Sequence, residues 1–134
     1  MKKIGMINAN ISAVIARMGH TDTLTIVDAG FPIPAATQRI DLALKPGVPG
    51  FLETLEVVAG ELFIEKIIVA EEIDRYSPQI LEGIQKILPG VPVEKIPHVE
   101  FKRQSGASQA VVRTAEFTPY ANVTLVAGAW GFKL

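Results

Sequence analysis

The sequence contains no cysteine, which excludes a disulfide framework, a thiolate metal site and a cysteine nucleophile. With two histidines and no cysteine, a zinc finger is impossible as well. No run of about 18 apolar residues is present, so no membrane insertion is expected. Polar residues also interrupt the stretch after the basic start, so we predict no signal peptide. The reducing cytoplasm is the default expectation for such a chain.

The sequence also lacks a large excess of either charge, since it has 13 Lys and Arg residues and 14 Asp and Glu residues. A nucleic-acid-binding domain would carry a basic excess on one face, so no nucleic acid partner is expected. Gly-rich phosphate loops of the standard spacings are absent, as are HExxH and GxSxG motifs. The sequence therefore predicts no nucleotide cofactor and no metal.

The chain is short, and its 134 residues suit one domain that spans residues 1–134. Hydrophobic residues make up 49% of it, and the mean hydropathy is +0.31. A small domain has much surface for its volume, and surplus apolar surface usually marks contact sites. We therefore expect a homo-oligomer.

Helical and strand patterns alternate along the chain. Helices are predicted over residues 11–18, 49–58, 78–88 and 100–104. Strands are predicted over residues 23–27, 39–44, 62–70, 93–96, 110–113 and 123–126. For the first helix, Asn10 is the expected N-cap and Gly19 the expected left-handed C-terminal cap. This order predicts an α/β layered domain with a largely parallel sheet flanked by helices.

Three polar side chains lie just after predicted strands: Asp28, His98 (after Pro97) and Glu116. Ligands of such sheets bind at the carboxyl ends of the strands, so these residues form a candidate site. The acidic pair Glu71-Glu72 also follows a strand. Adjacent side chains point to different faces, which is poor geometry for a shared-proton dyad, so we interpret this pair as a solvated helix start.

His20 lies between the first helix and the strand that Asp28 ends. Histidine is the side chain best able to gain and lose a proton near neutrality, and a helix C-terminus and a carboxylate would each favour its charged form. A solvated loop residue is the simpler interpretation of His20, and a surface or helix-capping residue that of His98. Tyr120 and Asn122 could hydrogen-bond a polyol, or cover the core and form a turn.

Several short motifs together resemble one known family. They are, in chain order, GHTDTL (19–24), DAGFPIP (28–34), RID (39–41), AEEI (70–73), PH (97–98) and PYAN (119–122). The combination resembles the D-ribose pyranases of the ribose/fucose mutarotase family over almost the whole chain. The L-fucose mutarotases are similar but typically show GHGD and an Asn-Phe-Pro turn. Residues 129–134 depart from the ribose pattern, which typically ends in a short Thr-Phe-like tail.

The resemblance implies a cytoplasmic, cofactor-free isomerase that interconverts pyranose and furanose forms of D-ribose and is associated with ribose uptake. It implies a decamer of two pentameric rings. It assigns His20 as proton donor and Asp28, His98, Tyr120 and Asn122 as substrate contacts. The alternatives are an L-fucose-type mutarotase and a non-catalytic sugar-binding module of a ribose transport system. Only His20 separates an enzyme from such a module, because binding alone does not demand a proton donor.

Overall fold

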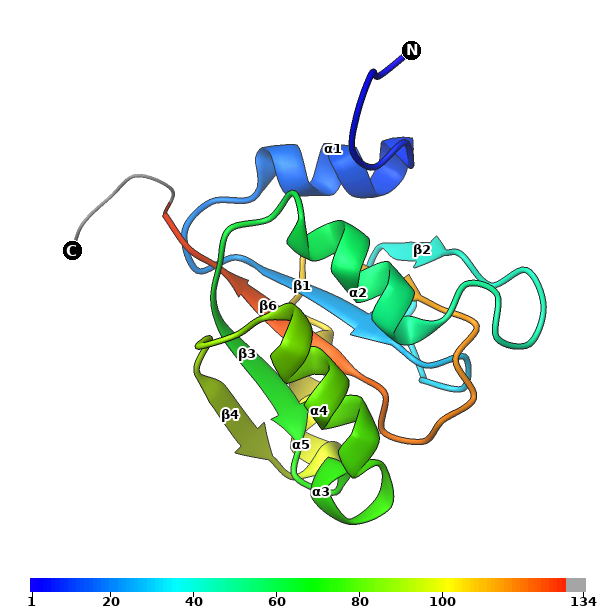
Figure 1. Cartoon of the computed structure of the whole chain (residues 1–134), viewed down its shortest axis with the longest axis vertical. Helices are drawn as coiled ribbons and strands as arrows, with labels where there is room; N and C mark the ends of the chain where they lie inside the picture. Colours follow the sequence, from blue (N-terminus) through cyan, green and yellow to red (C-terminus); the bar gives the residue numbers. More distant parts are fainter. Residues whose placement is uncertain (130–134) are drawn as a thin grey trace.

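A six-stranded sheet runs through the centre of the molecule, and the computed structural model describes residues 1–129 of the chain (Figure 1). The strands are β1 (Thr23–Val27), β2 (Arg39–Asp41), β3 (Ile64–Ala70), β4 (Val93–Ile96), β5 (Val111–Arg113) and β6 (Val123–Ala127). Their order in the sheet is β2-β5-β1-β6-β3-β4. The pairs β1–β5, β2–β5 and β3–β4 are parallel, and β6 alone is antiparallel to its neighbours. The predicted α/β class with a largely parallel sheet is confirmed.

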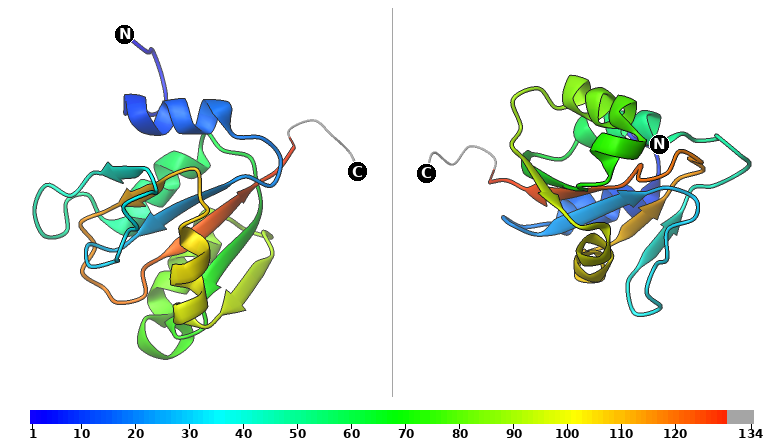
Figure 2. Two further views of the ribbon diagram at one scale, coloured as in Figure 1. Left: turned by 180° about the vertical axis from the view of Figure 1, so that it is seen from behind. Right: turned by 90° about the horizontal axis from the view of Figure 1, so that it is seen from below.

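Helices lie on both faces of this sheet. They are α1 (Ala9–Arg17), α2 (Phe51–Ala59), α3 (Ile73–Tyr76), α4 (Pro78–Ile87) and α5 (His98–Ser105). Helices α2 and α4 cover one face, and α5 lies on the other (Figure 2). The predicted helices and strands are all present with ends shifted by at most three residues. The unpredicted α3 has only four residues, too few for a helical hydrophobic period.

The core forms two apolar clusters, one on each face of the sheet. The larger lies under α1, α2 and α4, and the smaller lies under α5. Strand β1 serves both, because Leu24 and Ile26 point into the larger cluster and Val27 into the smaller one. Thr25, between Leu24 and Ile26, is also fully buried, so the strand is buried on both faces although two of its five residues are threonines.

The ends of α1 differ from the sequence expectation. The Asn8 side chain, not Asn10, caps the helix, since its Oδ1 accepts from the Ile11 amide at 2.9 Å. Gly19 does not adopt the left-handed conformation; Thr21 does, with φ of 71°. The Gly19 amide instead donates to Asp22 Oδ2 at 2.8 Å, so the Asp22 carboxylate closes the turn into β1.

The antiparallel direction of β6 decides what meets at each end of the sheet. Strands β1, β3, β4 and β5 end where β6 begins, and we call this the carboxyl end of the sheet. At the opposite, amino end, β6 finishes beside the start of β1, where the Thr21 amide donates to the Ala127 carbonyl at 2.9 Å. The single loop that leads from β5 into β6 therefore lies at the same end of the sheet as the loops that follow β1, β3 and β4.

Two further features complete the description of the chain. No helix within residues 1–129 is both long and apolar enough to span a membrane. The unusual C-terminal tail noted in the sequence begins at Ala129, and its residues from 130 onward lie outside the described part.

The packing of α2 onto the sheet gives a testable expectation. Leu55 is fully buried in the larger cluster, so Leu55→Ala should lower the free energy of unfolding by about 2–5 kcal/mol through lost burial and a residual cavity. Urea denaturation at a fixed protein concentration measures this change. Glu56→Ala, at the exposed next position, is the control and should stay within about 0.5 kcal/mol of the wild type. Equal effects of the two changes would contradict this packing.

Candidate functional site

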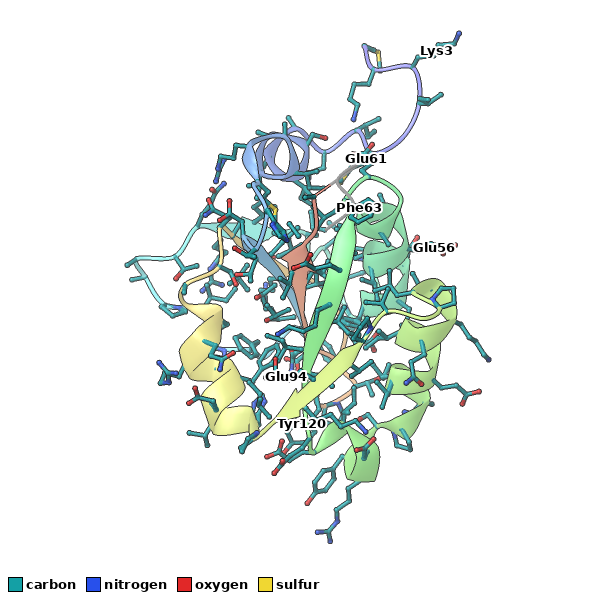
Figure 3. The ribbon with its side chains drawn as sticks, turned by 90° about the vertical axis from the view of Figure 1, so that its left-hand side faces the viewer. Lys3, Glu56, Glu61, Phe63, Glu94 and Tyr120 are labelled. Atoms are coloured by element: carbon teal, nitrogen blue, oxygen red, sulfur yellow. The ribbon has the colours of Figure 1, made fainter. Side chains whose placement is uncertain are left out.

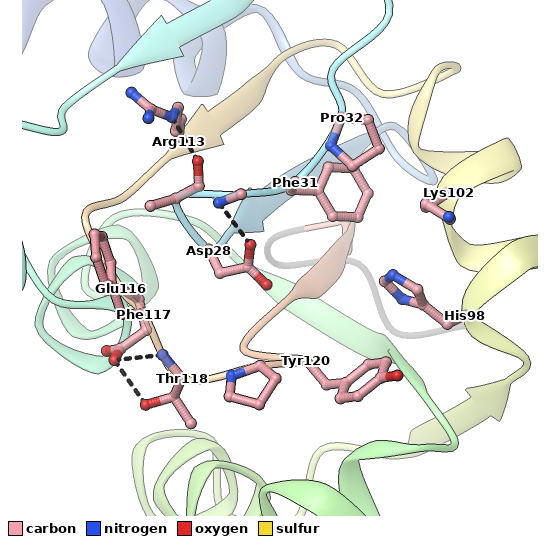
Figure 4. A pocket seen from close by; sticks show the side chains of 13 residues that line it. Asp28, Phe31, Pro32, His98, Lys102, Arg113, Glu116, Phe117, Thr118 and Tyr120 are labelled. Carbon is pink, nitrogen blue, oxygen red and sulfur yellow. Dashed lines mark hydrogen bonds between the residues drawn. The ribbon is translucent and has the colours of Figure 1, made fainter.

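A pocket of about 670 Å³ opens at the carboxyl end of the sheet (Figure 4). Its walls are the loop after β1, the first turns of α5, and the loop that leads from β5 into β6. The lining residues are Asp28, Ala29, Gly30, Phe31, Pro32, His98, Lys102, Arg113, Glu116, Phe117, Thr118, Pro119 and Tyr120. The three side chains expected at strand ends, those of Asp28, His98 and Glu116, therefore do meet in one cavity.

Asp28 lies directly after β1, and its neighbours fix it firmly. Its backbone amide donates to Asn122 Oδ1 at 2.9 Å, and its own Oδ1 accepts from the Gly30 amide at 3.0 Å. Burial raises the pKa of the Asp28 carboxyl above its ordinary value, although the Gly30 amide, Asn122 and the nearby His98 oppose the rise. A partly desolvated carboxylate of this kind is a good acceptor for hydroxyl groups of a ligand.

His98 is the first residue of α5, and aromatic rings enclose its imidazole. The ring meets Phe31 and Tyr120 edge-on, with centroid distances of 6.1 and 5.0 Å, and stacks on Phe101 at 6.4 Å. Burial lowers the pKa of His98, the positive charge of Lys102 lowers it further, and Glu72 and Asp28 partly oppose this. At neutral pH the ring is therefore neutral and offers one N–H donor and one nitrogen acceptor.

The loop before β6 brings Tyr120 and Asn122 to the same place. Tyr120 has a left-handed backbone, with φ of 60°, and its ring stacks on Tyr76 of α3 at 5.3 Å. Asn122 is fully buried, and its Oδ1 is occupied by the Asp28 amide. Its Nδ2 and the Nδ1 of His98 are buried side-chain atoms that form no hydrogen bond of normal geometry within residues 1–129, although Nδ2 is near enough to the Asp28 carboxylate to lower its pKa. Buried polar atoms are normally paired, so two unpaired ones beside a pocket indicate a site for a polar ligand.

Other charged residues of the pocket mainly build its walls. The Glu116 carboxylate accepts from the Phe51 amide at the start of α2 and from the Thr118 amide and hydroxyl. Partial burial raises the pKa of Glu116, but these hydrogen bonds outweigh burial and leave the pKa below its ordinary value. Arg113 donates to the Ala29 carbonyl at 2.9 Å and pairs with Asp41. Both groups are thus held by the protein itself.

Lys102 is a pocket residue that the sequence reasoning missed. It forms no ion pair within residues 1–129, and it lies close to His98 in the pocket (Figure 4). Its position on α5 is four residues after His98, which places both side chains on one face of the helix. This spacing was the available signal in the sequence. It identifies Lys102 as a pocket residue only once it is known which face of α5 is turned toward the pocket.

His20, by contrast, does not join this pocket within one chain. It lies at the amino end of the sheet, where its Nε2 contacts Glu65 Oε2 at 2.8 Å. Strand β1 separates it from Asp28, and the five residues of β1 alone span about 16 Å. Phe63, at the His20 end, and Tyr120, at the pocket end, lie near opposite ends of strand β3 (Figure 3). The carboxylate beside His20 is therefore that of Glu65 and not that of Asp28.

No three side chains of His, Asp or Glu within the described residues gather into a set that could hold a metal ion. The pocket lining combines charged and polar side chains, those of Asp28, His98 and Lys102 among them, with the apolar ring faces of Phe31 and Tyr120. An uncharged ligand that carries several hydroxyl groups matches this mixture, because each hydroxyl both donates and accepts.

Comparison with known proteins gives consistent matches. Residues 1–130 match the model of the RbsD / FucU transport protein family. A D-ribose pyranase of Lactobacillus gasseri is 52% identical, and one of Laribacter hongkongensis 49%; each match covers 96% of this chain and 98% of the relative. The structure of Bacillus subtilis RbsD complexed with D-ribose superposes with a TM-score of 0.93 at 42% identity, covering 96% of this chain and 98% of that one.

A more distant structure shares the fold. The fucose mutarotase of Streptococcus pneumoniae, in complex with L-fucose, superposes with a TM-score of 0.79 at 21% identity. That match covers 92% of this chain and 94% of the other. At this identity the likeness shows the common architecture alone.

The charge of Asp28 predicts a measurable effect on stability. Because burial raises its pKa in the folded state, the ionised carboxyl destabilises the fold at pH 7, and this cost vanishes as the pH falls through the raised pKa. Asp28→Asn keeps the oxygen that accepts from Gly30 and removes the charge. It should raise the free energy of unfolding at pH 7 by the order of 0.5 kcal/mol, a modest figure because solvent screens a partly exposed group.

Urea denaturation at pH 7 and at pH 4.5 tests this expectation, and the gain should shrink at the lower pH. Asp22→Asn is the control, because it makes the same chemical change in a turn at the other end of β1. A variant of Asp28 that is no more stable than the wild type at pH 7 would contradict a burial cost at this position.

Proposed function

We propose that this chain, which belongs to the RbsD / FucU transport protein family, is a D-ribose pyranase that interconverts the pyranose and furanose forms of D-ribose. It is an isomerase and binds the monosaccharide in the pocket at the carboxyl end of the sheet. The observation that carries the proposal is the convergence of Asp28, His98 and Tyr120 on one pocket, beside buried Asn122, in a chain half identical to D-ribose pyranases.

The reaction requires two proton transfers and no redox change. A donor protonates the ring oxygen while a base removes the proton of the anomeric hydroxyl, so that the bond from C1 to the ring oxygen breaks and the open-chain aldehyde forms. The hydroxyl of C4 then adds to C1, and proton transfers in the reverse sense close the furanose. Positioned acid and base groups typically supply about 10²–10⁴ in rate.

The pocket residues have properties that suit this reaction. The Asp28 carboxylate accepts from sugar hydroxyls, and the neutral His98 ring both donates and accepts. Asn122 Nδ2 and His98 Nδ1, the two unpaired buried atoms, gain partners when a sugar is bound. Tyr120 contributes a ring face and a hydroxyl at the pocket wall. These four residues hold the substrate in the proposal, as the family resemblance implies.

Within this proposal the proton donor is His20, supplied by another copy of the chain. His20 and the pocket lie at opposite ends of β1, so a single chain cannot bring the two together. The imidazole is accessible to a neighbour, since 39% of its side chain is exposed, and the adjacent Phe63 is 52% exposed. An exposed apolar ring beside an exposed histidine is the composition expected of a contact surface.

A closed ring would use both ends of the sheet at once. If the amino end of one subunit meets the carboxyl end of the next, every contact is heterologous, and closure gives a cyclic assembly. The proposed decamer of two pentameric rings meets this condition. The proposal locates the enzyme in the cytoplasm, where an isomerised sugar is available to the enzymes that consume it.

The first test is sugar exchange itself. The wild type should accelerate exchange between ribopyranose and ribofuranose in chelator-treated buffer, as measured by NMR saturation transfer between the ribose signals. His20→Ala should lose about 10²–10⁴ of this acceleration while ribose affinity changes little, because the proton is delivered mainly in the transition state. His98→Ala should weaken ribose binding, since it removes a substrate contact.

The outcomes separate the competing functions. A wild type that binds ribose yet leaves its exchange at the buffer rate is the sugar-binding module and not an enzyme. A wild type that prefers L-fucose in the same assay is a fucose-type mutarotase. Normal exchange by His20→Ala, with exchange abolished but binding intact in His98→Ala, would reverse the roles of the two histidines.

Mixing variants tests whether two copies build each site. His20→Ala and Asp28→Asn subunits should each be nearly inactive alone. After joint dissociation in urea and reassembly at equal amounts, about a quarter of the sites should pair an intact His20 with an intact Asp28, and activity should recover to that extent. Light scattering on the same samples measures the assembly.

Mixtures in which one variant is replaced by the double variant form the control, because no intact site can then arise. Absence of recovery in samples that have reassembled would contradict a shared site, and so would a stable monomer that retains full activity.

A further inference from the structure

Glu72 is a half-buried carboxylate that lies outside the pocket and still contacts a pocket residue. It follows β3 at the carboxyl end of the sheet, and its two oxygens lie 3.0 and 3.1 Å from the backbone nitrogen of His98. The two residues face each other because β3 and β4 are parallel neighbours, with Ala70 opposite Ile96. The Glu71 amide donates to the Ile96 carbonyl at 2.7 Å and extends this pairing beyond the strands.

The contact replaces a cap that α5 lacks. Pro97 stands at the N-cap position of α5 and forms no side-chain hydrogen bond to the first turn. The first amides of a helix have no partner within the helix, so the His98 amide needs an acceptor from elsewhere. Glu72 supplies it with a charge-assisted bond, which also complements the positive end of the helix.

The segment that carries Glu72 is fixed at two further points around the pocket. Tyr76, at the end of α3, stacks on Tyr120, and the Ser77 hydroxyl donates to the Pro119 carbonyl at 2.5 Å. The short helix α3 and its ends therefore support both His98 and Tyr120 from behind. Because Ser77 is fully buried, the segment has a rigid base.

We propose that Glu72 is a positioning residue, which sets the place of His98 in the sugar pocket and the charge balance around its ring. This inference rests on the proposed function, because it concerns the same site. Glu72 does not line the pocket, so it acts through His98 and not through the substrate. The sequence alone indicates only that Glu72 is part of a solvated helix start, and the proposal now gives it a role in substrate binding.

Four groups face the His98 ring from the elements around it. Glu72 lies at the start of α3, Asp28 after β1, Lys102 on α5 and Tyr120 before β6. Glu72 and Asp28 oppose the fall in the pKa of His98, whereas burial and Lys102 cause that fall. Loss of the charge of Glu72 should therefore lower the pKa of His98 further, so that the ring stays neutral to lower pH.

The sequence provides a matched pair of variants for the test. Glu72→Gln keeps one acceptor oxygen for the His98 amide and loses the charge, and Glu72→Ala loses both. Glu71→Gln makes the same change at the exposed adjacent position, where the side chain forms no hydrogen bond or ion pair within residues 1–129. The chain has only two histidines, so ¹³Cε1-labelled histidine gives two titration curves, which His98→Ala assigns.

Three results are expected in the full-length assembled protein. Glu72→Gln should shift the titration of His98, and the acid limb of ribose binding with it, to lower pH. Glu72→Ala should weaken ribose binding about tenfold or more through loss of a charge-assisted bond, and Glu72→Gln should recover most of that loss. Glu71→Gln should match the wild type in every measurement.

The inference is overturned if Glu72→Ala binds ribose as the wild type does, or if Glu72→Gln leaves the titration of His98 unchanged. A loss of stability in urea without either site effect would make Glu72 a purely structural cap and also overturns it. Failure of the proposed function looks different: the wild type would not accelerate ribose exchange, while the variants would still shift the titration of His98.

Discussion

The antiparallel placement of β6 between β1 and β3 is the constraint on which the site depends. In a fully parallel sheet, the segment before each strand would lie at the amino end, away from any pocket at the carboxyl end. Because β6 runs the other way, its preceding loop brings Tyr120 and Asn122 to the ends of β1 and β4, where Asp28 and His98 lie. The bond from the Asp28 amide to Asn122 Oδ1 fixes this meeting.

Burial at this meeting point determines the chemistry that the pocket can offer. Desolvation acts in opposite directions on the two titratable groups, because it raises the pKa of Asp28 and lowers that of His98. Near neutral pH the pocket then contains a partly desolvated carboxylate beside a neutral imidazole. Such a pair exchanges hydrogen bonds with hydroxyl groups, whereas a charged imidazole would pair with the carboxylate and compete with the ligand.

Sequence patterns predicted nearly all the elements of the fold because hydrophobic periods and Gly or Pro punctuation are local signals. They also placed Asp28, His98 and Glu116 at one end of the sheet, which follows from parallel strand order. Helix α3 escaped prediction because four residues give no period. The partner of His20 could not be predicted either, since the contact with Glu65 depends on where β3 lies in the sheet and not on distance along the chain.

The acids that follow strands illustrate a further limit of sequence reasoning. Asp28, Glu72 and Glu116 come after β1, β3 and β5, yet only the Asp28 carboxylate does not bind the first amide of a helix. Glu72 accepts from the first amide of α5 and Glu116 from the first amide of α2, so both carboxylates cap the start of a helix. The Asp28 carboxylate binds the Gly30 amide of its own turn and caps no helix. Neither capped helix directly follows its acid along the chain, because Glu72 is followed by α3 and Glu116 by the loop that leads into β6. The role of each carboxylate is therefore decided by which helix begins beside it in the folded structure.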